Sequence, residues 1–324
     1  MRHSLIPAWL LVGSCLLQAQ APRDKLLLAV NRQDNSVSVF KVAGGASLLK
    51  TLPVGKLPRE LCLAPDGKRA YVSNTAENSS TVLDLDGLSA VGTISNPEMQ
   101  APDGCVVSPD SRKVYITAAR KNSVFVFSAE SLKLLKEIPA GQQPRRAVFS
   151  PDGKKLYVAN ARSNSLSVID PSTDTVKGTI KVGREPRNML YTADGKYLIV
   201  CNIEDDTLSF IQSDTGEVDT VVGVVQSPQR LWLTRDGELL FVLGRLGDVL
   251  GIVSLRPEAE TRRIIHTVPL GTRLPWSMTG TDDGKYLYIS FNGDDSIAVF
   301  DLQLMKITGR LRAGKEPSDL AFRR

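Results

Sequence analysis

A short turn sequence recurs along almost the whole chain at a nearly constant spacing. The turn is Asp-Gly or a close variant, and its aspartates are Asp66, Asp110, Asp152, Asp194, Asp236 and Asp283. Successive copies therefore lie 44, 42, 42, 42 and 47 residues apart. A period near 42 residues is typical of a small four-stranded unit that cannot bury its apolar face alone. The chain is therefore a repeat of such units from end to end.

The third copy shows the unit most clearly. Residues 146–150 and 156–160 are apolar segments on either side of Pro151-Asp152-Gly153-Lys154, a tight turn with Pro and Gly where a β-turn favours them. Residues 165–170 alternate between polar and apolar, as a third strand should, and residues 175–182 supply a fourth. Helical periodicity is absent. We therefore predict an all-β fold of four-stranded blades.

The second strand of each unit is the most apolar, and it allows the units to be counted. Its copies end at Asn31, Asn74, Ala118, Asn160, Asn202, Gly244 and Asn292, which makes seven. The first unit begins at its second strand, near Lys25, and the last strand of the chain, residues 317–322, is the first strand of a unit. We expect these ends to join in the last blade of a seven-bladed β-propeller, because closure removes exposed sheet edges.

The first 21 residues have the pattern of a secretory signal peptide. A basic start at Arg2 precedes a mostly apolar stretch over residues 5–17 and small residues after it. We predict that residues 1–21 are cleaved, and that residues 22–324 form a single propeller domain that is periplasmic or secreted. The alternative is a lipoprotein: Val12-Gly13-Ser14-Cys15 resembles a lipobox, in which Cys15 would be the membrane anchor.

The composition of the chain argues against several kinds of partner and site. The chain has 40 Lys and Arg against 35 Asp and Glu without a basic block, so nucleic acid is not a favoured partner. Of two histidines, His3 lies in the predicted signal peptide, and His266 alone is too few for a common zinc site. The place of His266 in an outer strand argues against a Ser-His-Asp device. The acidic clusters at 204–206 and 294–295 are read as solvated loops rather than cation sites. We expect no cofactor, no metal and no catalytic residue.

Three cysteines remain outside the predicted signal peptide: Cys62, Cys105 and Cys201. Each lies in an apolar run, which favours buried free thiols. Cys62 is the fourth residue after Pro58, whereas Cys105 is the third after Pro102. Because side chains alternate along a strand, this offset places the two thiols on opposite faces of equivalent strands. We therefore predict that they are not bonded to each other.

In a propeller, the turns that precede the innermost strands, Gly-x-x-Pro or a variant, gather around one mouth of the central channel. The first residues after each Pro are Arg59, Asp103, Arg145, Arg187, Gln229, Trp276 and Ser318, and the second are Glu60, Gly104, Arg146, Asn188, Arg230, Ser277 and Asp319. Five arginines thus meet three carboxylates, and arginine is suited to binding carboxylates or phosphates.

We predict a ligand site at this mouth, for a small anionic ligand or a protein partner. Its predicted residues are Arg59, Asp103, Arg145, Arg187, Asn188, Arg230, Trp276 and Asp319. The alternative is that these groups pair among themselves and that Trp276 only plugs the channel.

The strand sequences Tyr71-Val72-Ser73-Asn74 and Tyr157-Val158-Ala159-Asn160, with Pro-Asp-Gly-Lys before them, resemble the YVTN-type repeat of YncE-like exported β-propellers. The resemblance covers nearly the whole chain after residue 21. Because propellers host many unrelated activities, the resemblance implies the fold and is compatible with several functions. We favour a non-catalytic binding or scaffold protein that is a monomer. The alternatives are a lactonase-like hydrolase of the 6-phosphogluconolactonase type and, third, an accessory protein of a periplasmic quinoprotein oxidation system.

Overall fold

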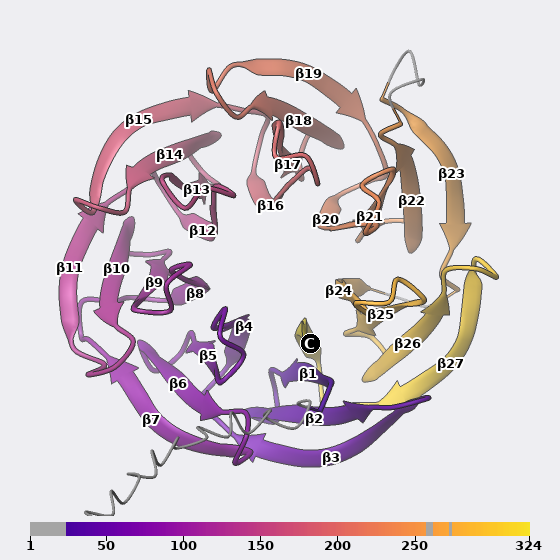
Figure 1. The fold of residues 1–324 in the computed structure, drawn as a ribbon, viewed down its shortest axis with the longest axis horizontal. Helices are drawn as coiled ribbons and strands as arrows, with labels where there is room; N and C mark the ends of the chain where they lie inside the picture. The colour runs from indigo at the N-terminus through magenta and orange to yellow at the C-terminus, as the bar shows by residue number, and fades with distance from the viewer. Residues whose placement is uncertain (1–23, 257–261, 272–273) are drawn as a thin grey trace, which may run out of the picture.

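The computed structural model describes residues 24–256, 262–271 and 274–324, which form seven four-stranded antiparallel sheets. The sheets stand around a central axis like the blades of a propeller (Figure 1). The predicted fold is thus confirmed. The predicted signal peptide and the alternative lipidation site at Cys15 lie outside the described residues. None of the described segments is a helix long and apolar enough to cross a membrane.

Each blade runs from an inner strand beside the axis to an outer strand at the rim. Blade one is Pro58–Leu63 (β4), Arg69–Asn74 (β5), Ser79–Asp84 (β6) and Ser89–Ser95 (β7). Blade two is Pro102–Val107 (β8), Lys113–Ala118 (β9), Ser123–Ser128 (β10) and Leu134–Pro139 (β11). Blade three is Pro144–Phe149 (β12), Leu156–Asn160 (β13), Ser165–Asp170 (β14) and Thr175–Lys181 (β15). Blade four is Pro186–Tyr191 (β16), Tyr197–Asn202 (β17), Thr207–Gln212 (β18) and Val218–Gly223 (β19).

The remaining blades follow the same order. Blade five is Pro228–Leu233 (β20), Leu239–Gly244 (β21), Val249–Ser254 (β22) and Ile264–Pro269 (β23). Blade six is Pro275–Gly280 (β24), Tyr286–Phe291 (β25), Ser296–Asp301 (β26) and Lys306–Arg312 (β27). The closing blade is Pro317–Arg323 (β28), Leu26–Asn31 (β1), Ser36–Val42 (β2) and Ala46–Pro53 (β3).

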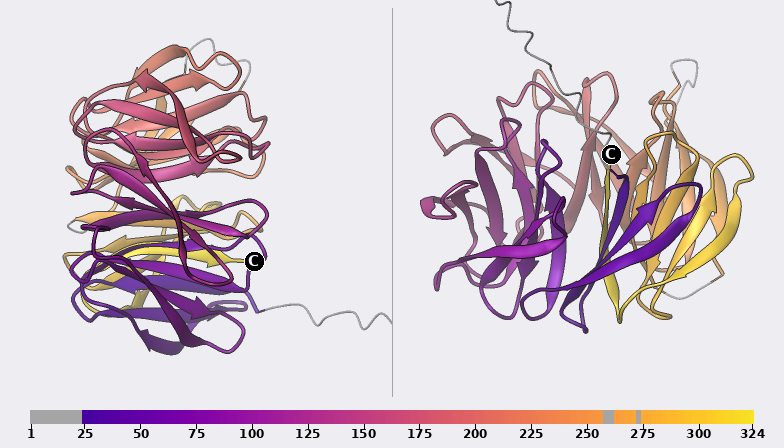
Figure 2. Two further views of the ribbon diagram at one scale, coloured as in Figure 1. Left: turned by 90° about the vertical axis from the view of Figure 1, so that its left-hand side faces the viewer. Right: turned by 60° about the horizontal axis from the view of Figure 1, so that its bottom comes forward.

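The ring closes as the ends of the repeat predict. β28, near the C-terminus, pairs antiparallel with β1, with Leu27 opposite Phe322 and Ala29 opposite Leu320. The inner strand of the closing blade thus comes from one end of the chain and its other three strands from the other end (Figures 1 and 2). Both side neighbours of β1 are then occupied, so the closure leaves no exposed edge at this strand.

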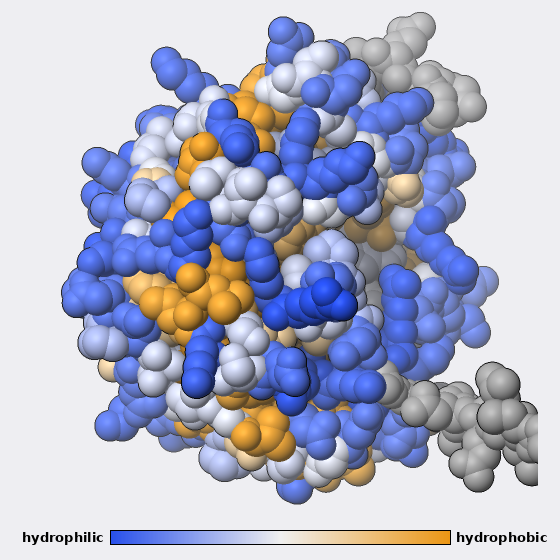
Figure 3. Space-filling view, turned by 60° about the vertical axis from the view of Figure 1, so that its left-hand side comes forward, coloured by the Kyte–Doolittle hydropathy of each residue, from blue (hydrophilic) through white to orange (hydrophobic). Residues whose placement is uncertain are grey.

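The core lies between neighbouring blades. Second strands are buried along almost their whole length, since both faces of each sheet pack against another sheet. Tyr71, Tyr115, Tyr157 and Tyr288 occupy equivalent positions in four of these strands and are fully buried. Large apolar side chains that remain exposed, such as Leu135 and Val176, lie on outer strands. Figure 3 shows such patches among mostly hydrophilic side chains.

A side-chain hydrogen bond repeated in all seven blades fixes the spacing of neighbouring sheets. In the loop between the second and third strands of each blade, an Asn or Asp side chain accepts a hydrogen bond from a backbone N–H of the next blade. The donor is the residue just before the Pro that begins the inner strand of that blade. The acceptors are Asn35, Asn78, Asn122, Asn164, Asp206, Asp248 and Asp295, at 2.7–3.2 Å. These residues have φ near +50°, a conformation that Asn and Asp tolerate well.

Residues of the acidic loop clusters therefore help to hold the blades together. Asp206 and Asp295 join neighbouring blades, while Asp205 pairs with Arg184 and Asp294 with Arg310. Within the described ranges there is no group of three or more His, Cys, Asp or Glu side chains that could hold a metal ion.

The repeated Asn at the end of the second strand explains the Gly of the Gly-x-x-Pro turn. Asn74 donates through Nδ2 to Ser79 and Thr81 Oγ atoms, both at 3.0 Å. A Cβ added at Gly55 would lie 2.6 Å from Asn74 Cγ, so only glycine fits there. In blade six the predicted alignment is wrong by one residue, because Phe291, not Asn292, pairs with Pro275 at this position.

Closure can be tested by truncation. Deleting residues 317–324 removes β28 and exposes the edge of β1. We expect the melting temperature to fall by more than about 10 °C, since each kcal/mol lost shifts it by about 2–4 °C in a domain of this size. Deleting only the exposed Arg324 is the control and should change little. An unchanged melting temperature after the longer deletion would contradict closure by β28.

Candidate functional site at the arginine-lined mouth

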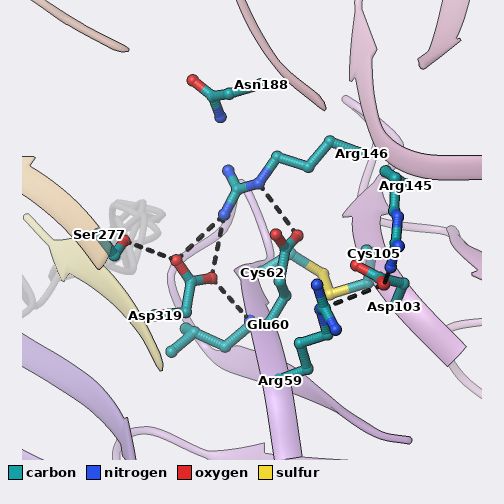
Figure 4. Close-up of polar contacts among 12 residues, drawn as sticks. Arg59, Glu60, Cys62, Asp103, Cys105, Arg145, Arg146, Asn188, Ser277 and Asp319 are labelled. Carbon is teal, nitrogen blue, oxygen red and sulfur yellow. Dashed lines mark hydrogen bonds and ion pairs between the residues drawn. A yellow bond between two sulfur atoms is a disulfide. The ribbon is translucent and has the colours of Figure 1, made fainter. Parts of the chain in front are cut away.

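The inner strands deliver their first side chains to the axis. In blades one to four the register shifts just after the strand's Pro, so the next two residues do not pair with the second strand. Such irregularities re-aim side chains. The polar side chains that follow these prolines therefore meet at one mouth of the channel, as predicted (Figure 4).

Asp319, from the closing strand β28, is buried beside this mouth, where it contacts Arg146 and Arg230 of the lining. Its carboxylate accepts hydrogen bonds from Leu61 N at 3.0 Å and Ser277 Oγ at 2.8 Å. It also accepts bonds from Arg230 Nη2 at 2.6 Å and Arg146 Nη2 at 3.1 Å. Its donors belong to blades one, three, five and six, and only 1% of its side chain is exposed. Asp319 is therefore a structural hub.

Glu60 completes a charge-balanced group around the axis. It pairs with Arg146 at 3.0 Å and with Arg230 at 3.2 Å. Burial alone would raise the pKa of Glu60, but Arg146 and Arg230 outweigh it and lower the pKa to about 2. Burial likewise opposes the charge of Arg146, yet Glu60 and Asp319 raise its pKa. We call Glu60, Arg146, Arg230, Ser277 and Asp319 the axial cluster.

A second group beside the axial cluster carries excess positive charge. Asp103 pairs with both Arg59, at 3.1 Å, and Arg145, and only 4% of its side chain is exposed. Arg187 lies near these two arginines and pairs at 2.9 Å with Glu185, which is a quarter exposed. Burial, together with the charges of Arg145 and Arg59, lowers the pKa of Arg187 to about 10. We call Arg59, Arg145 and Arg187 the arginine trio.

The other predicted site residues have partners within the protein. Asn188 Oδ1 accepts the N–H of Leu231 at 3.0 Å, which joins blades four and five. Trp276 lines the mouth, and the Arg245 guanidinium lies 4.7 Å from its ring centroid. The space left among the lining side chains is only about 10 Å³, which is room for roughly one water molecule. The structure thus brings the predicted residues together, but fills the channel with their own contacts.

A disulfide joins Cys62 and Cys105, so the prediction of unbonded thiols is wrong. The prediction compared faces of equivalent strands. In a propeller, however, one face of a blade packs on the opposite face of the next blade. Thiols on opposite faces of β4 and β8 therefore point toward each other, and their Cα atoms are 5.7 Å apart. Cys201 is a buried free thiol, as predicted, and burial raises its pKa.

Seven four-stranded sheets closed by both ends of the chain around a polar axis define the class of seven-bladed β-propellers. Family models agree: the YncE-like β-propeller model matches residues 146–242, and the seven-bladed lactonase propeller model matches residues 19–107 and 93–181. The lactonase model spans residues 19–181, half of the chain, so the chain belongs to this family of seven-bladed β-propellers, and the shorter YncE-like match supports a YVTN-type repeat within it. No curated protein matches it by sequence.

Solved structures share the fold at low sequence identity. The periplasmic gluconolactonase of Pseudomonas aeruginosa is 18% identical, with a TM-score of 0.78 over 93% of this chain and 99% of that one. A protein of unknown function from Desulfotomaculum acetoxidans is 15% identical, with a TM-score of 0.79 over 92% and 98%. Hydrazine synthase of Kuenenia stuttgartiensis is 22% identical, with a TM-score of 0.72 over 81% and 88%. These likenesses show the fold.

The axial cluster predicts acid sensitivity. The pKa of Glu60 in the folded protein, about 2, lies below the 4.5 of an unperturbed glutamate, so its ionisation stabilises the folded state above pH 4.5. That contribution should be lost as the pH falls from 4.5 toward about 2. In Glu60→Gln, urea unfolding measured across this range should show a shallower loss of stability than in the wild type. Identical pH profiles would contradict the assignment.

The disulfide can be tested by reduction. It closes a loop of 43 residues, and its loss should lower the free energy of unfolding by roughly 2–4 kcal/mol. We expect a reducing agent to destabilise the wild type but not the Cys62→Ala/Cys105→Ala variant. Peptide mapping of the unreduced protein should yield a Cys62–Cys105 linked peptide and a free Cys201. Recovery of all three as free thiols from air-oxidised protein would refute the bond.

Proposed function

We propose that this protein is a non-catalytic binding propeller whose arginine-lined mouth recognises an anionic group of a ligand or partner. The observation that carries the proposal is the uneven sharing of charge at the mouth. The three guanidinium groups of the arginine trio share one buried carboxylate, Asp103, and one partly exposed carboxylate, Glu185. Burial is the main cause of the lowered pKa of Arg187, and the charges of Arg145 and Arg59 add to it.

A bound anion would relieve that excess. The side chains of Arg59, Arg145 and Arg187 are 20%, 13% and 16% exposed, so their outer edges can be reached from solvent. Charge-assisted hydrogen bonds from guanidinium groups to carboxylate or phosphate are stronger than neutral ones. Trp276 and the Arg245 guanidinium above it supply a flat wall on the same mouth.

The size of the site favours a protruding anionic group over a whole metabolite. Small-molecule sites usually enclose about 300–1,000 Å³. The space among the mouth residues is about 10 Å³. A ligand therefore contacts the arginine trio from the solvent side and with its anionic end only, because the axial cluster fills the channel.

We also propose that the protein is exported and acts outside the cytoplasm. The basic and apolar pattern of residues 1–21 supports this, and so does the Cys62–Cys105 disulfide. Disulfides persist mainly in oxidising compartments.

A lactonase-like hydrolase is the second candidate. The shared fold of the Pseudomonas aeruginosa gluconolactonase supports it, together with a groove of about 570 Å³ on the opposite face. The groove lies between blades two and three and is lined in part by Lys113, Tyr115, Phe149 and Asp152. Hydrolysis of 6-phosphogluconolactone by the purified protein, assayed with and without divalent cations, tests this candidate directly. Turnover lost in Asp152→Asn would favour it over the binding role.

The binding role can be tested with simple anions. We expect glutarate and inorganic phosphate to bind at low ionic strength, as measured by calorimetry. Arg187→Gln should weaken binding by about tenfold or more, because a charge-assisted contact contributes roughly 1.5–3 kcal/mol. Arg187→Lys should lose less, since it keeps the charge.

Lys154→Ala, on the opposite face, is the matched control and should bind as the wild type does. The melting temperature of each variant shows whether it is folded. Equal affinity of wild type and Arg187→Gln, or a loss confined to Lys154→Ala, would move the site away from this mouth.

A further inference from the structure

Two exposed arginines extend the positive charge of the mouth outward over blades two and three. Arg120 lies in the loop between β9 and β10, and Arg162 lies in the equivalent loop between β13 and β14. Both are exposed, and neither side chain has a hydrogen-bond or ion-pair partner among the described residues. They are therefore free to bind an external anion.

Backbone hydrogen bonds hold these loops beside the mouth. Arg120 N donates to Gln100 O at 3.2 Å, two residues before Pro102 and the start of the strand that carries Asp103. Arg162 N donates to Gln142 O at 3.1 Å, two residues before Pro144 and the start of the strand that carries Arg145. Each exposed arginine thus flanks an inner strand that contributes to the group around Asp103.

The positively charged surface formed by Arg120 and Arg162 is confined to blades two and three. The equivalent loop position in the other blades carries Gln33, Ala76, Glu204, Leu246 and Gly293, none of them a cation. On the blade-four side the exposed Glu204 would repel an anion. The other rim cations near this sector are engaged, since Lys121 pairs with Glu98 at 2.6 Å and Arg184 pairs with Asp205.

We infer that the partner of this mouth is an acidic peptide segment of another protein, which lies over blades two and three. One of its carboxylates meets the arginine trio, and further carboxylates meet Arg120 and Arg162. Two features favour a peptide over a compact small anion: the mouth admits only the tip of a ligand, and the free arginines lie outward from it on loops. This inference rests on the proposed function, because it assigns the partner of the same site.

The probe is a hexa-aspartate peptide, compared with glutarate. Six extended residues span up to about 20 Å, enough to leave the mouth and follow the rim. We expect the peptide to bind the wild type at least about tenfold more tightly than glutarate, with an affinity that falls as salt is added. The Arg120→Gln/Arg162→Gln variant should lose about two- to fivefold of peptide affinity per arginine and leave glutarate binding unchanged.

The matched control is Arg112→Gln, an exposed arginine of blade two on the opposite face, which should behave as the wild type. Peptide affinity no higher than that of glutarate, or unaffected by the double variant, would overturn the acidic-peptide inference. If glutarate binding is still lost in Arg187→Gln, the proposed function stands without it. If neither probe binds the wild type, both fail. A thymidine hexanucleotide that binds as tightly as the peptide would assign the surface to polyanions in general and overturn the peptide partner.

Discussion

The carboxylate of Asp319 is the interaction on which the ring depends. A seven-bladed ring has no covalent closure, so its last blade must be held by contacts between the two ends of the chain. Asp319 sits on the closing strand and accepts hydrogen bonds from four other blades at once. Removing one partner of such a buried charge is costly, because the remaining charges stay buried without compensation. Closure and the polar axis are therefore one structural feature.

This feature divides the mouth into two parts with different roles. The axial cluster has two carboxylates and two arginines, all directed at one another, and it fills the channel. Among the described residues, the carboxylates that pair with the arginine trio are Asp103, which is buried, and Glu185, which is a quarter exposed. A ring held together by the first group can present the second to a partner without loss of stability. The same separation explains why Arg230 and Asp319, both predicted as ligand contacts, serve the fold.

Sequence reasoning was most successful where the same type of residue recurs at the same position of successive blades. The period of the Asp-Gly turns indicated four-stranded blades, the apolar second strands indicated their number, and the out-of-phase ends indicated the closure. The prolines gave the residues that meet at the mouth. The pairing among those residues could not be predicted, because it depends on how each side chain crosses the axis, and Arg146 reaches Asp319 from a strand 173 residues away.

Two other features were missed for physical reasons that the structure explains. The Cys62–Cys105 bond was missed because alternation was applied within one sheet, whereas the bond joins facing surfaces of two sheets. The loop Asn and Asp acceptors were missed because their acidic members, such as Asp206, looked like solvated turns. Each acceptor lies four residues after the last residue of the second strand, and this constant spacing could have identified them.

Hydrogen–deuterium exchange of Asp319→Asn tests most directly the claim that one carboxylate joins the blades. Under conditions where the variant stays folded, amide protection should fall together in β4, β12, β20 and β24, which carry Leu61, Arg146, Arg230 and Ser277. The outer strands should keep the protection they have in the wild type. A loss of protection confined to β28, with the four distant inner strands unchanged, would contradict the account.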